Sequence, residues 1–175
     1  MSLNLEQKKA LVAELAEVAR RAQSLVAAEY AGLTVEKMTE LRRKARESGV
    51  YVKVAKNTLM RRAVQGTDYA CASDQFSGPL LFAFSKDDPG AAARLIRDLV
   101  KASQEVVKPR FVALGGRVYP GTELERVASL PTREQALAML LGLLKAPIVR
   151  LARTLAEPAA RLARATAAVR DRKAA

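Results

Sequence analysis

The sequence predicts an α/β protein, in which a compact α/β sandwich-like domain is followed by a long, proline-segmented C-terminal helix. Short runs of apolar and β-branched residues alternate with segments whose apolar residues recur every three or four positions, the pattern of strands that alternate with helices. Half of the 175 residues are hydrophobic, which is enough to form a core. Beyond Pro131 the helical spacing continues to the end of the chain.

Capping residues, glycines and prolines set the expected boundaries of the elements before Pro131. Asn4 with Gln7, and Thr122 with Glu125, have the spacing of capping boxes at helix starts. The expected elements, in order, are a helix over 4–23, a strand over 24–30, a helix from the Thr34 cap to Gly49, a strand over 50–54, a short helix capped by Asn57 and running through Val64, a polar connection over 68–77, a strand over 79–84, a helix with Asp88 as its cap and Pro89 as its first residue, a strand over 105–114, a Gly115-Gly116 turn before a short strand over 117–119, and a short helix over 122–129.

The segment Leu130-Pro131-Thr132 divides the chain. We expect one domain over residues 1–130 and a helical tail over residues 131–175, because the elements before residue 130 suffice for one compact core. Thr132 is the expected cap of the tail helix, with Gln135 in capping-box position.

The charge balance points to a polyanionic partner. Lys and Arg number 30 against 18 Asp and Glu, a net charge of +12. Nucleic acid is the favoured partner and an anionic membrane surface is the rival. Because we see no apolar run long enough to span a membrane, we expect a cytoplasmic protein without a membrane partner. The charge pattern itself does not separate RNA from DNA.

The amino-acid composition argues against enzymatic catalysis and metal binding. Histidine is absent and Cys71 is the one cysteine, so the commonest general base, the commonest zinc ligand and any disulfide framework are missing. No glycine-rich phosphate loop is present. We expect no enzyme activity, no cofactor and no metal.

Basic residues concentrate between Lys37 and Arg62, a segment with nine Lys and Arg residues but only two acidic residues. We expect them to converge on one strand–turn–helix corner, with a phosphate site at the turn before Asn57. Since aromatic stacking platforms are few, we expect recognition of the backbone and shape of a folded RNA. The candidate RNA-binding residues are Lys8, Gly32, Arg42, Arg43, Lys53, Lys56, Asn57, Thr58, Arg61 and Arg62.

The tail contains an eleven-residue repeat. The units 146–156 and 157–167 share a proline, an Arg-Leu-Ala-Arg core and a closing alanine in register, and 135–145 fits the same apolar pattern. Eleven residues are about three helical turns, so the apolar positions stay on nearly one face. Pro147 and Pro158 are expected to kink or segment the helix into three docking units. The candidate partner-binding residues are Leu137, Leu140, Leu141, Leu144, Ile148, Leu151, Leu155 and Leu162.

A tail helix of this length should extend beyond a domain of about 130 residues, so we interpret its stripe as a partner-binding surface. Flanking arginines would favour an acidic partner. Two alternatives stay open: the helix packs on its own domain, or it lies on a membrane surface.

Several motifs in order resemble the bacterial stalk-base protein of the large ribosomal subunit, the ribosomal protein L-ten family. The resemblance covers essentially the whole chain. The motifs are 32–42, Lys56-Asn57-Thr58-Leu59, Gly78-Pro79, 89–94, Leu130-Pro131-Thr132 and Ala168-Val169-Arg170-Asp171.

The resemblance implies a structural ribosomal protein. It implies that residues 1–130 bind 23S rRNA at the stalk base, beside ribosomal protein L-eleven, and that residues 131–175 carry two or three dimers of the acidic stalk protein. Those dimers would recruit translational GTPases. The family also includes proteins that repress translation of their own messenger RNA. The other hypotheses are a stand-alone RNA regulator with a self-associating tail, a membrane-surface adaptor, and an enzyme.

Overall fold

The computed structural model describes residues 4–86, 88–102 and 107–174. The chain divides into two units, Met1–Thr132 and Arg133–Ala175. The first unit contains a sheet with helices, and the second is a helix.

The first unit is built on a five-stranded sheet of order β2-β3-β1-β4-β5, in which each neighbouring pair is antiparallel. β1 and β2 therefore run in the same direction with β3 between them, and β3 and β4 do so with β1 between them. This is the split β-α-β arrangement. The strands are β1 (Ser24–Glu29), β2 (Val50–Val54), β3 (Leu80–Ser85), β4 (Lys108–Leu114) and β5 (Arg117–Pro120).

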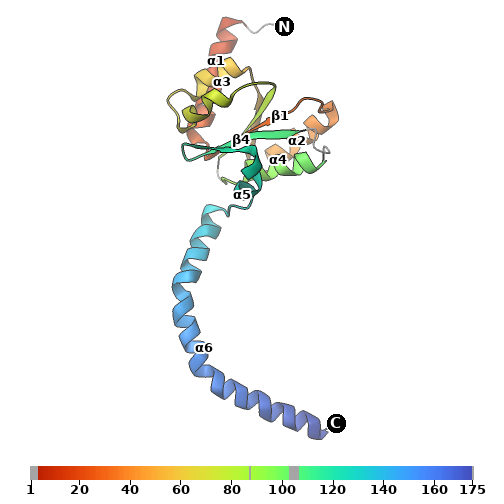
Figure 1. Cartoon of the computed structure of the whole chain (residues 1–175), viewed down its shortest axis with the longest axis vertical. Helices are drawn as coiled ribbons and strands as arrows, with labels where there is room; N and C mark the ends of the chain where they lie inside the picture. The colour runs from red at the N-terminus through yellow and green to blue at the C-terminus, as the bar shows by residue number, and fades with distance from the viewer. Residues whose placement is uncertain (1–3, 87, 103–106, 175) are drawn as a thin grey trace. The chain divides into compact units, whose positions relative to one another are not determined.

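Helices cover both faces of this sheet (Figure 1), which confirms the predicted α/β class. α2, α4 and α5 pack on one face, and α1, α3 and the 3-10 helix η1 pack on the other. A second 3-10 helix, η2, precedes α5. The bounds are α1 (Leu5–Arg21), α2 (Val35–Glu47), α3 (Asn57–Val64), η1 (Asp68–Gln75), α4 (Ala91–Ala102), η2 (Gly121–Glu123) and α5 (Leu124–Ala128).

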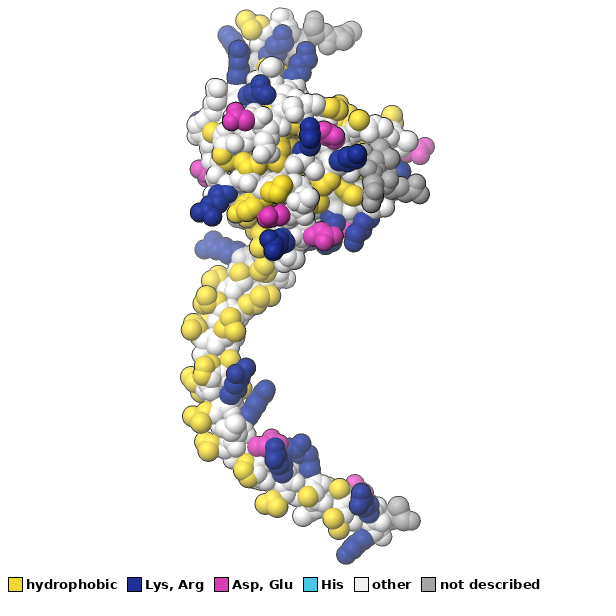
Figure 2. Space-filling view, viewed as in Figure 1, with side chains coloured by type: hydrophobic (Ala, Val, Ile, Leu, Met, Phe, Trp, Pro, Cys, Tyr) yellow, Lys and Arg dark blue, Asp and Glu magenta, His cyan; other side chains and the backbone are white. Residues whose placement is uncertain are grey.

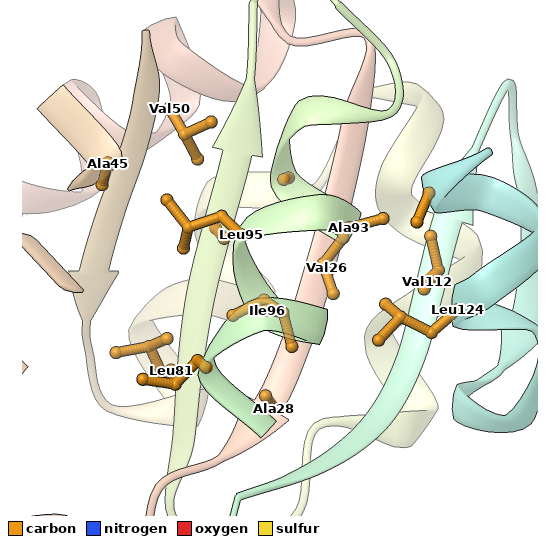
Figure 3. Packing of buried hydrophobic residues seen from close by; sticks show 14 of the residues in the cluster. Val26, Ala28, Ala45, Val50, Leu81, Ala93, Leu95, Ile96, Val112 and Leu124 are labelled. Carbon is orange, nitrogen blue, oxygen red and sulfur yellow. The ribbon is translucent and has the colours of Figure 1, made fainter. Parts of the chain in front are cut away.

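Alternate residues of the central strands enter two separate cores. In β1, Val26 and Ala28 belong to the core under α2 and α4, whereas Leu25 and Ala27 belong to the core under α1 and α3. Figure 3 shows the first core, where Ile96 of α4 lies over the sheet with no exposed surface. Because side chains alternate along a strand, a sheet buried on both faces needs apolar residues at every position.

Most sequence-based boundaries are confirmed. The Asn4–Gln7 capping box is present, the Thr34 hydroxyl accepts from the Lys37 N–H, and Gly115-Gly116 joins β4 to β5 with both φ angles positive. The strand expected over 105–114 is confirmed from Lys108 onward, while positions 105 and 106 lie outside the described residues.

Two expected caps are wrong. Asn57 is the first residue of α3, not its cap, because its side-chain amide donates to the Gly78 carbonyl at 2.9 Å. The capping box expected at Thr122 is replaced by η2, which leads into α5 without a side-chain cap. At Gly121 the chain lies so close to the Pro109 carbonyl that a Cβ would overlap it.

Most of the region expected as a polar connection, 68–77, is η1 (Asp68–Gln75), and the region contributes to the core. Tyr69 and Ala72 are buried, and the Phe76 ring lies 5.3 Å from the Phe82 ring and 5.6 Å from the Phe111 ring, measured between centroids. The Tyr69 hydroxyl donates to the Ala22 carbonyl. Burial, reinforced by Asp68, raises the pKa of Tyr69 to about 12. The polar residues of this segment are interspersed with apolar ones that face the core, so its composition did not indicate its burial.

The start of α4 also differs from expectation. The helix begins at Ala91, and Pro89 lies in the preceding turn. The Asp88 carboxylate accepts from the Gly90 N–H at 3.0 Å and pairs with Arg94 at 2.8 Å. The helix thus begins two residues later than expected, and Asp88 contacts its start from the preceding turn.

The second unit is one continuous helix, α6 (Arg133–Ala174), with Pro147 and Pro158 inside it. The ribbon curves along its length but is not divided (Figure 1). Each proline removes one N–H donor, and the carbonyls four residues earlier lose that partner. Because no described residue of α6 is buried, water can take the donor's place. The prolines therefore shape the helix without ending it.

We expect Ile96→Ala to lower the free energy of unfolding by about 2–5 kcal/mol, because it leaves a cavity in the first core, and Ile96→Val to lower it by about 0.5–1.5 kcal/mol. Urea denaturation followed by tyrosine fluorescence measures this, since all four tyrosines precede residue 132. Val35→Ala is the control because Val35 is 83% exposed, and its change should stay within about 0.5 kcal/mol. Equal effects of Ile96→Ala and Val35→Ala would contradict the packing described.

Candidate nucleic-acid interface and exposed helix

Four of the candidate RNA-binding residues meet at one end of the first unit. α1 and α3 pack side by side on the sheet, and this brings Lys8 of α1 to the beginning of α3. Lys8, Lys56, Thr58 and Arg62 line a pocket of about 220 Å³ with Leu59. We call this the basic pocket. Figure 2 shows Lys and Arg side chains gathered at the end of the domain where α1 begins.

The first turn of α3 adds backbone donors to this end. Lys56 is the N-cap and makes no side-chain capping bond. Among the described residues, no partner accepts from the N–H groups of Asn57 and Thr58. The first N–H groups of a helix and its dipole favour an anion. With three cationic side chains beside them, these donors make the basic pocket suited to phosphate.

A second, larger pocket adjoins the basic pocket. It has a volume of about 550 Å³ and shares Lys56, Thr58 and Leu59 with it. Tyr30, at the end of β1, also lines it. We call it the apolar pocket. Gly32 lines neither of these pockets; it lies in the turn after Tyr30, where its φ of 88° suits glycine.

The side-chain amide of Asn57 connects two segments at this end of the domain. The bond from Asn57 to Gly78 links the first turn of α3 to the segment that leads into β3. Gly78 has a φ of 85°, so the chain turns sharply at the point where the amide holds it. The sequence identified Asn57 as a cap, and the structure gives it a connecting role between two segments of the same site.

The structure does not bring all the basic residues together. Arg42 and Arg43 are exposed on α2, on the opposite face of the sheet from α3, and Arg43 pairs with Glu47 at 3.8 Å. The expectation that the cluster converges on one corner is therefore wrong for these two arginines. A count of charge along the chain cannot tell which face of a sheet each helix will cover. The RNA contact predicted for them from the sequence is untested, and the basic pocket forms without them.

Lys53 is on the same face as α1 but has a local partner. Its ammonium lies 3.6 Å from the Glu14 carboxylate and 6.0 Å from the centroid of the Tyr51 ring. The Tyr51 hydroxyl donates to the same carboxylate. Burial and then this hydrogen bond hold the pKa of Tyr51 well above its usual range. Glu14 thus links α1 to β2 and forms an ion pair with Lys53.

Arg61 also has a structural partner. Its guanidinium donates to the carbonyls of Ser73 and Phe76 at 3.1 and 2.9 Å, and so fastens η1 to α3. Arg62, one residue later, points into the basic pocket. Neighbouring arginines of one helix therefore have different roles.

The candidate partner-binding residues of α6 form an exposed apolar stripe. All eight are between 52% and 75% exposed, and no described residue of α6 is buried. Their spacing of three, four and eleven residues places them on one side of the helix. On the face shown in Figure 2, hydrophobic side chains cover the first half of α6, and Lys and Arg appear from its middle onward.

The arginines of α6 lie off this stripe and differ from one another. Arg161 and Arg164 both pair with Glu157, at 3.2 and 2.9 Å. Arg150 and Arg153 have no ion pair with any described residue. The unit 146–156 therefore presents two unpaired positive charges, whereas in the unit 157–167 one carboxylate offsets one of the two arginines.

The expectation that no segment is long and apolar enough to span a membrane is corrected here. Within Arg133–Lys173 an 18-residue window has a mean hydropathy of 1.5 and no more than two charged residues, so the helix is suited to a membrane by length and composition. No uninterrupted apolar run in this helix is long enough for a span. Lys145 and Arg150 interrupt the run, and each would cost about 2.5–3.5 kcal/mol at a bilayer centre.

Nothing among the described residues suggests a metal centre, because no group of three Cys, Asp or Glu side chains converges on one point. Cys71 is exposed on η1.

Comparison with known proteins gives the family. The model of the family "Ribosomal protein L10" matches residues 3–101, and that of "Ribosomal protein uL10 C-terminal region" matches residues 130–156. The chain is similar to the large ribosomal subunit proteins uL10 of Alkalilimnicola ehrlichii, Thioalkalivibrio sulfidiphilus and Halorhodospira halophila, with 57, 55 and 54% identity. Each alignment covers 99% of this chain and 98% of the relative.

We expect Arg61→Ala to lower the free energy of unfolding by about 1–3 kcal/mol, because two carbonyls lose a charged donor. Arg62→Ala should change it by less than about 0.5 kcal/mol, since the Arg62 side chain lies in an open pocket. Urea denaturation of the two variants compares these residues on the same helix. If Arg62→Ala were the more destabilising, the division of roles between them would be wrong.

Proposed function

The chain belongs to the ribosomal protein L10 family and is a structural component of the large ribosomal subunit; from this premise we propose that it forms the base of the stalk, binding 23S rRNA through the basic pocket and carrying acidic stalk-protein dimers on α6. A protein of the large subunit works in the cytoplasm, on the ribosome, and its role there is structural. No enzymatic role is proposed.

The meeting of Lys8, Lys56 and Arg62 at the first turn of α3 carries the RNA part of this proposal. Three cations line one small pocket at the start of α3, where the first two N–H groups of the helix have no partner among the described residues, and together these groups supply what a phosphate needs. Lys8 is distant from the other two in sequence, so the packing of α1 on α3 creates the cluster. A folded RNA presents phosphates at fixed spacing, which suits a rigid cluster on two packed helices.

The exposed stripe of α6 supports the partner part. An apolar stripe of this length in water binds something or promotes aggregation. In a ribosomal protein we propose protein dimers, bound in the helix-in-groove mode, one at each eleven-residue unit. The unpaired Arg150 and Arg153 favour an acidic partner. Through those dimers the chain would act indirectly on translational GTPases.

The third unit, 157–167, is the weakest candidate. Ala159 stands where the second unit has Ile148, Ala163 stands where the first unit has Leu141, and the family model of the C-terminal region ends at residue 156. Its arginines are paired with Glu157. We nevertheless propose three dimers, because Leu162 is 70% exposed in register with Leu151.

Two further partners follow from the family resemblance alone. We propose ribosomal protein L-eleven as the neighbour at the stalk base and binding to the chain's own messenger RNA as a route to self-repression. A messenger that folds like the rRNA site would use the same basic pocket.

For RNA binding, we expect Lys8→Gln, Lys56→Gln and Arg62→Gln each to weaken binding of a 23S rRNA stalk-base fragment roughly five- to tenfold, or about 1–1.4 kcal/mol. Each variant should also reduce the slope of log affinity against log salt by about 1. Fluorescence anisotropy over a salt series measures both.

The matched variant is Arg43→Gln on the other face of the sheet. We expect its affinity to stay within about twofold of the unmodified chain, because its guanidinium pairs with Glu47 and lies away from the basic pocket. An equal loss for Arg43→Gln would extend the RNA footprint onto α2 and contradict a single basic pocket.

For the tail, we expect native mass spectrometry to show three stalk-protein dimers on the unmodified chain. Leu151→Asp with Leu155→Asp should remove one dimer, since a carboxylate on the stripe opposes burial in a partner groove. Arg153→Gln, on the other side of the same unit, should keep all three. Two dimers on the unmodified chain would rule out the third site, and an unchanged count for the Asp variant would rule out the stripe.

A further inference from the structure

We propose that the apolar pocket receives one unstacked nucleobase of the RNA whose phosphate occupies the basic pocket. This rests on the proposed RNA-binding function and extends it, because backbone and shape recognition alone would leave the apolar pocket empty. The occupant we infer is a base of an unpaired nucleotide within the folded RNA.

The lining of the apolar pocket suits a base. Its volume of about 550 Å³ lies within the range of small-molecule sites. Enzymes and single-strand-binding proteins hold an extruded base between aromatic or apolar side chains. Apart from the residues that it shares with the basic pocket, this pocket is lined chiefly by Leu11, Tyr30, Val54, Ala55, Pro79 and Leu80.

The junction of the two pockets has the chemistry of a nucleotide. Lys56, Thr58 and Leu59 line both pockets. A phosphate at Lys56 and Arg62 would therefore lie beside an opening into an apolar space, and in a nucleotide the ribose joins the phosphate to a base whose flat faces are suited to apolar contacts. An apolar side chain of a protein partner could fill the apolar pocket but would leave the adjoining cations without an anion.

Polar groups at the junction can read the base. Since the Asn57 amide nitrogen donates to the Gly78 carbonyl, its oxygen faces away from that bond and remains an acceptor. The Thr58 hydroxyl is exposed, and neither group has a further partner among the described residues. An acceptor and a hydroxyl match a base that presents N–H donors. A pocket with one such acceptor would favour a base carrying an amino group.

The test combines a protein variant in which a larger side chain fills the apolar pocket with RNA fragments that each lack one base. Val54→Phe places a ring into the apolar pocket from the edge strand β2, where Val54 is 36% exposed. The RNA is a 23S rRNA stalk-base fragment in which each unpaired nucleotide in turn is made abasic. With the full chain, we expect one abasic position to weaken binding roughly 5- to 150-fold, the value of one stacked base. With Val54→Phe, intact RNA should bind equally weakly, and that abasic position should cause no further loss.

Val35→Phe is the matched control, because Val35 is exposed on α2 and faces no part of either pocket. Tyr30→Leu is a second pocket variant that keeps the experiment decisive if Val54→Phe unfolds; it removes the aromatic surface, and the loss at the same abasic position should shrink. Tyrosine fluorescence and urea denaturation confirm that each variant is folded.

The outcomes separate the inference from the proposed function. If Lys56→Gln weakens binding but Val54→Phe and Tyr30→Leu bind all RNAs as the unmodified chain does, RNA binding stands and the base pocket is overturned. If losses at every abasic position add to that of Val54→Phe, the pocket holds no base. If Val54→Phe spares RNA affinity but blocks a neighbouring ribosomal protein, its occupant is a protein. If none of the variants changes affinity, the proposed function itself fails.

Discussion

Burial of the central strands on both faces is the constraint on which the rest of the first unit depends. β1 and β3 have apolar residues at nearly every position, so neither face of the sheet can be left to water. Helices must cover both sides, and the chain supplies them from alternating segments. The core under α1 and α3 fixes where those two helices meet. Lys8 can therefore join Lys56 and Arg62 only because Leu15, Met60 and their neighbours are buried.

The second unit, in contrast, leaves its apolar residues unburied. α6 has apolar residues in a regular stripe, yet none of its described residues is buried. A helix in water gains most of its stability from tertiary packing, so an unburied stripe of this length calls for a partner. The same length and apolar content satisfy a membrane criterion. Membership of a ribosomal family, together with the charges within the helix, supports the proposed protein partner over lipid.

Positive charge is used in two ways in this molecule. Arg61 and Arg94 donate to backbone carbonyls and hold elements together, Arg61 between α3 and η1 and Arg94 between α4 and the end of α5. Arg62 and Lys56 instead line an open pocket. A net charge of +12 therefore overstates the number of cations available to RNA. The cations that line the basic pocket are few, but the packing of α1 on α3 fixes their positions.

The sequence by itself determined the order and type of the strands and α-helices, though not the two 3-10 helices, because helix caps, glycines and hydrophobic period are local features. It also determined the tail repeat, since an eleven-residue period keeps side chains on one face of any helix. It failed where a distant contact overrode the local signal, as when Gly78 draws the Asn57 amide away from capping and the core draws Tyr69 inward. Which basic residues share a face, and that Tyr30 and Pro79 line a pocket beside Lys56, only the tertiary structure decided, because strand order and the packing of helices on a sheet are set by long-range burial.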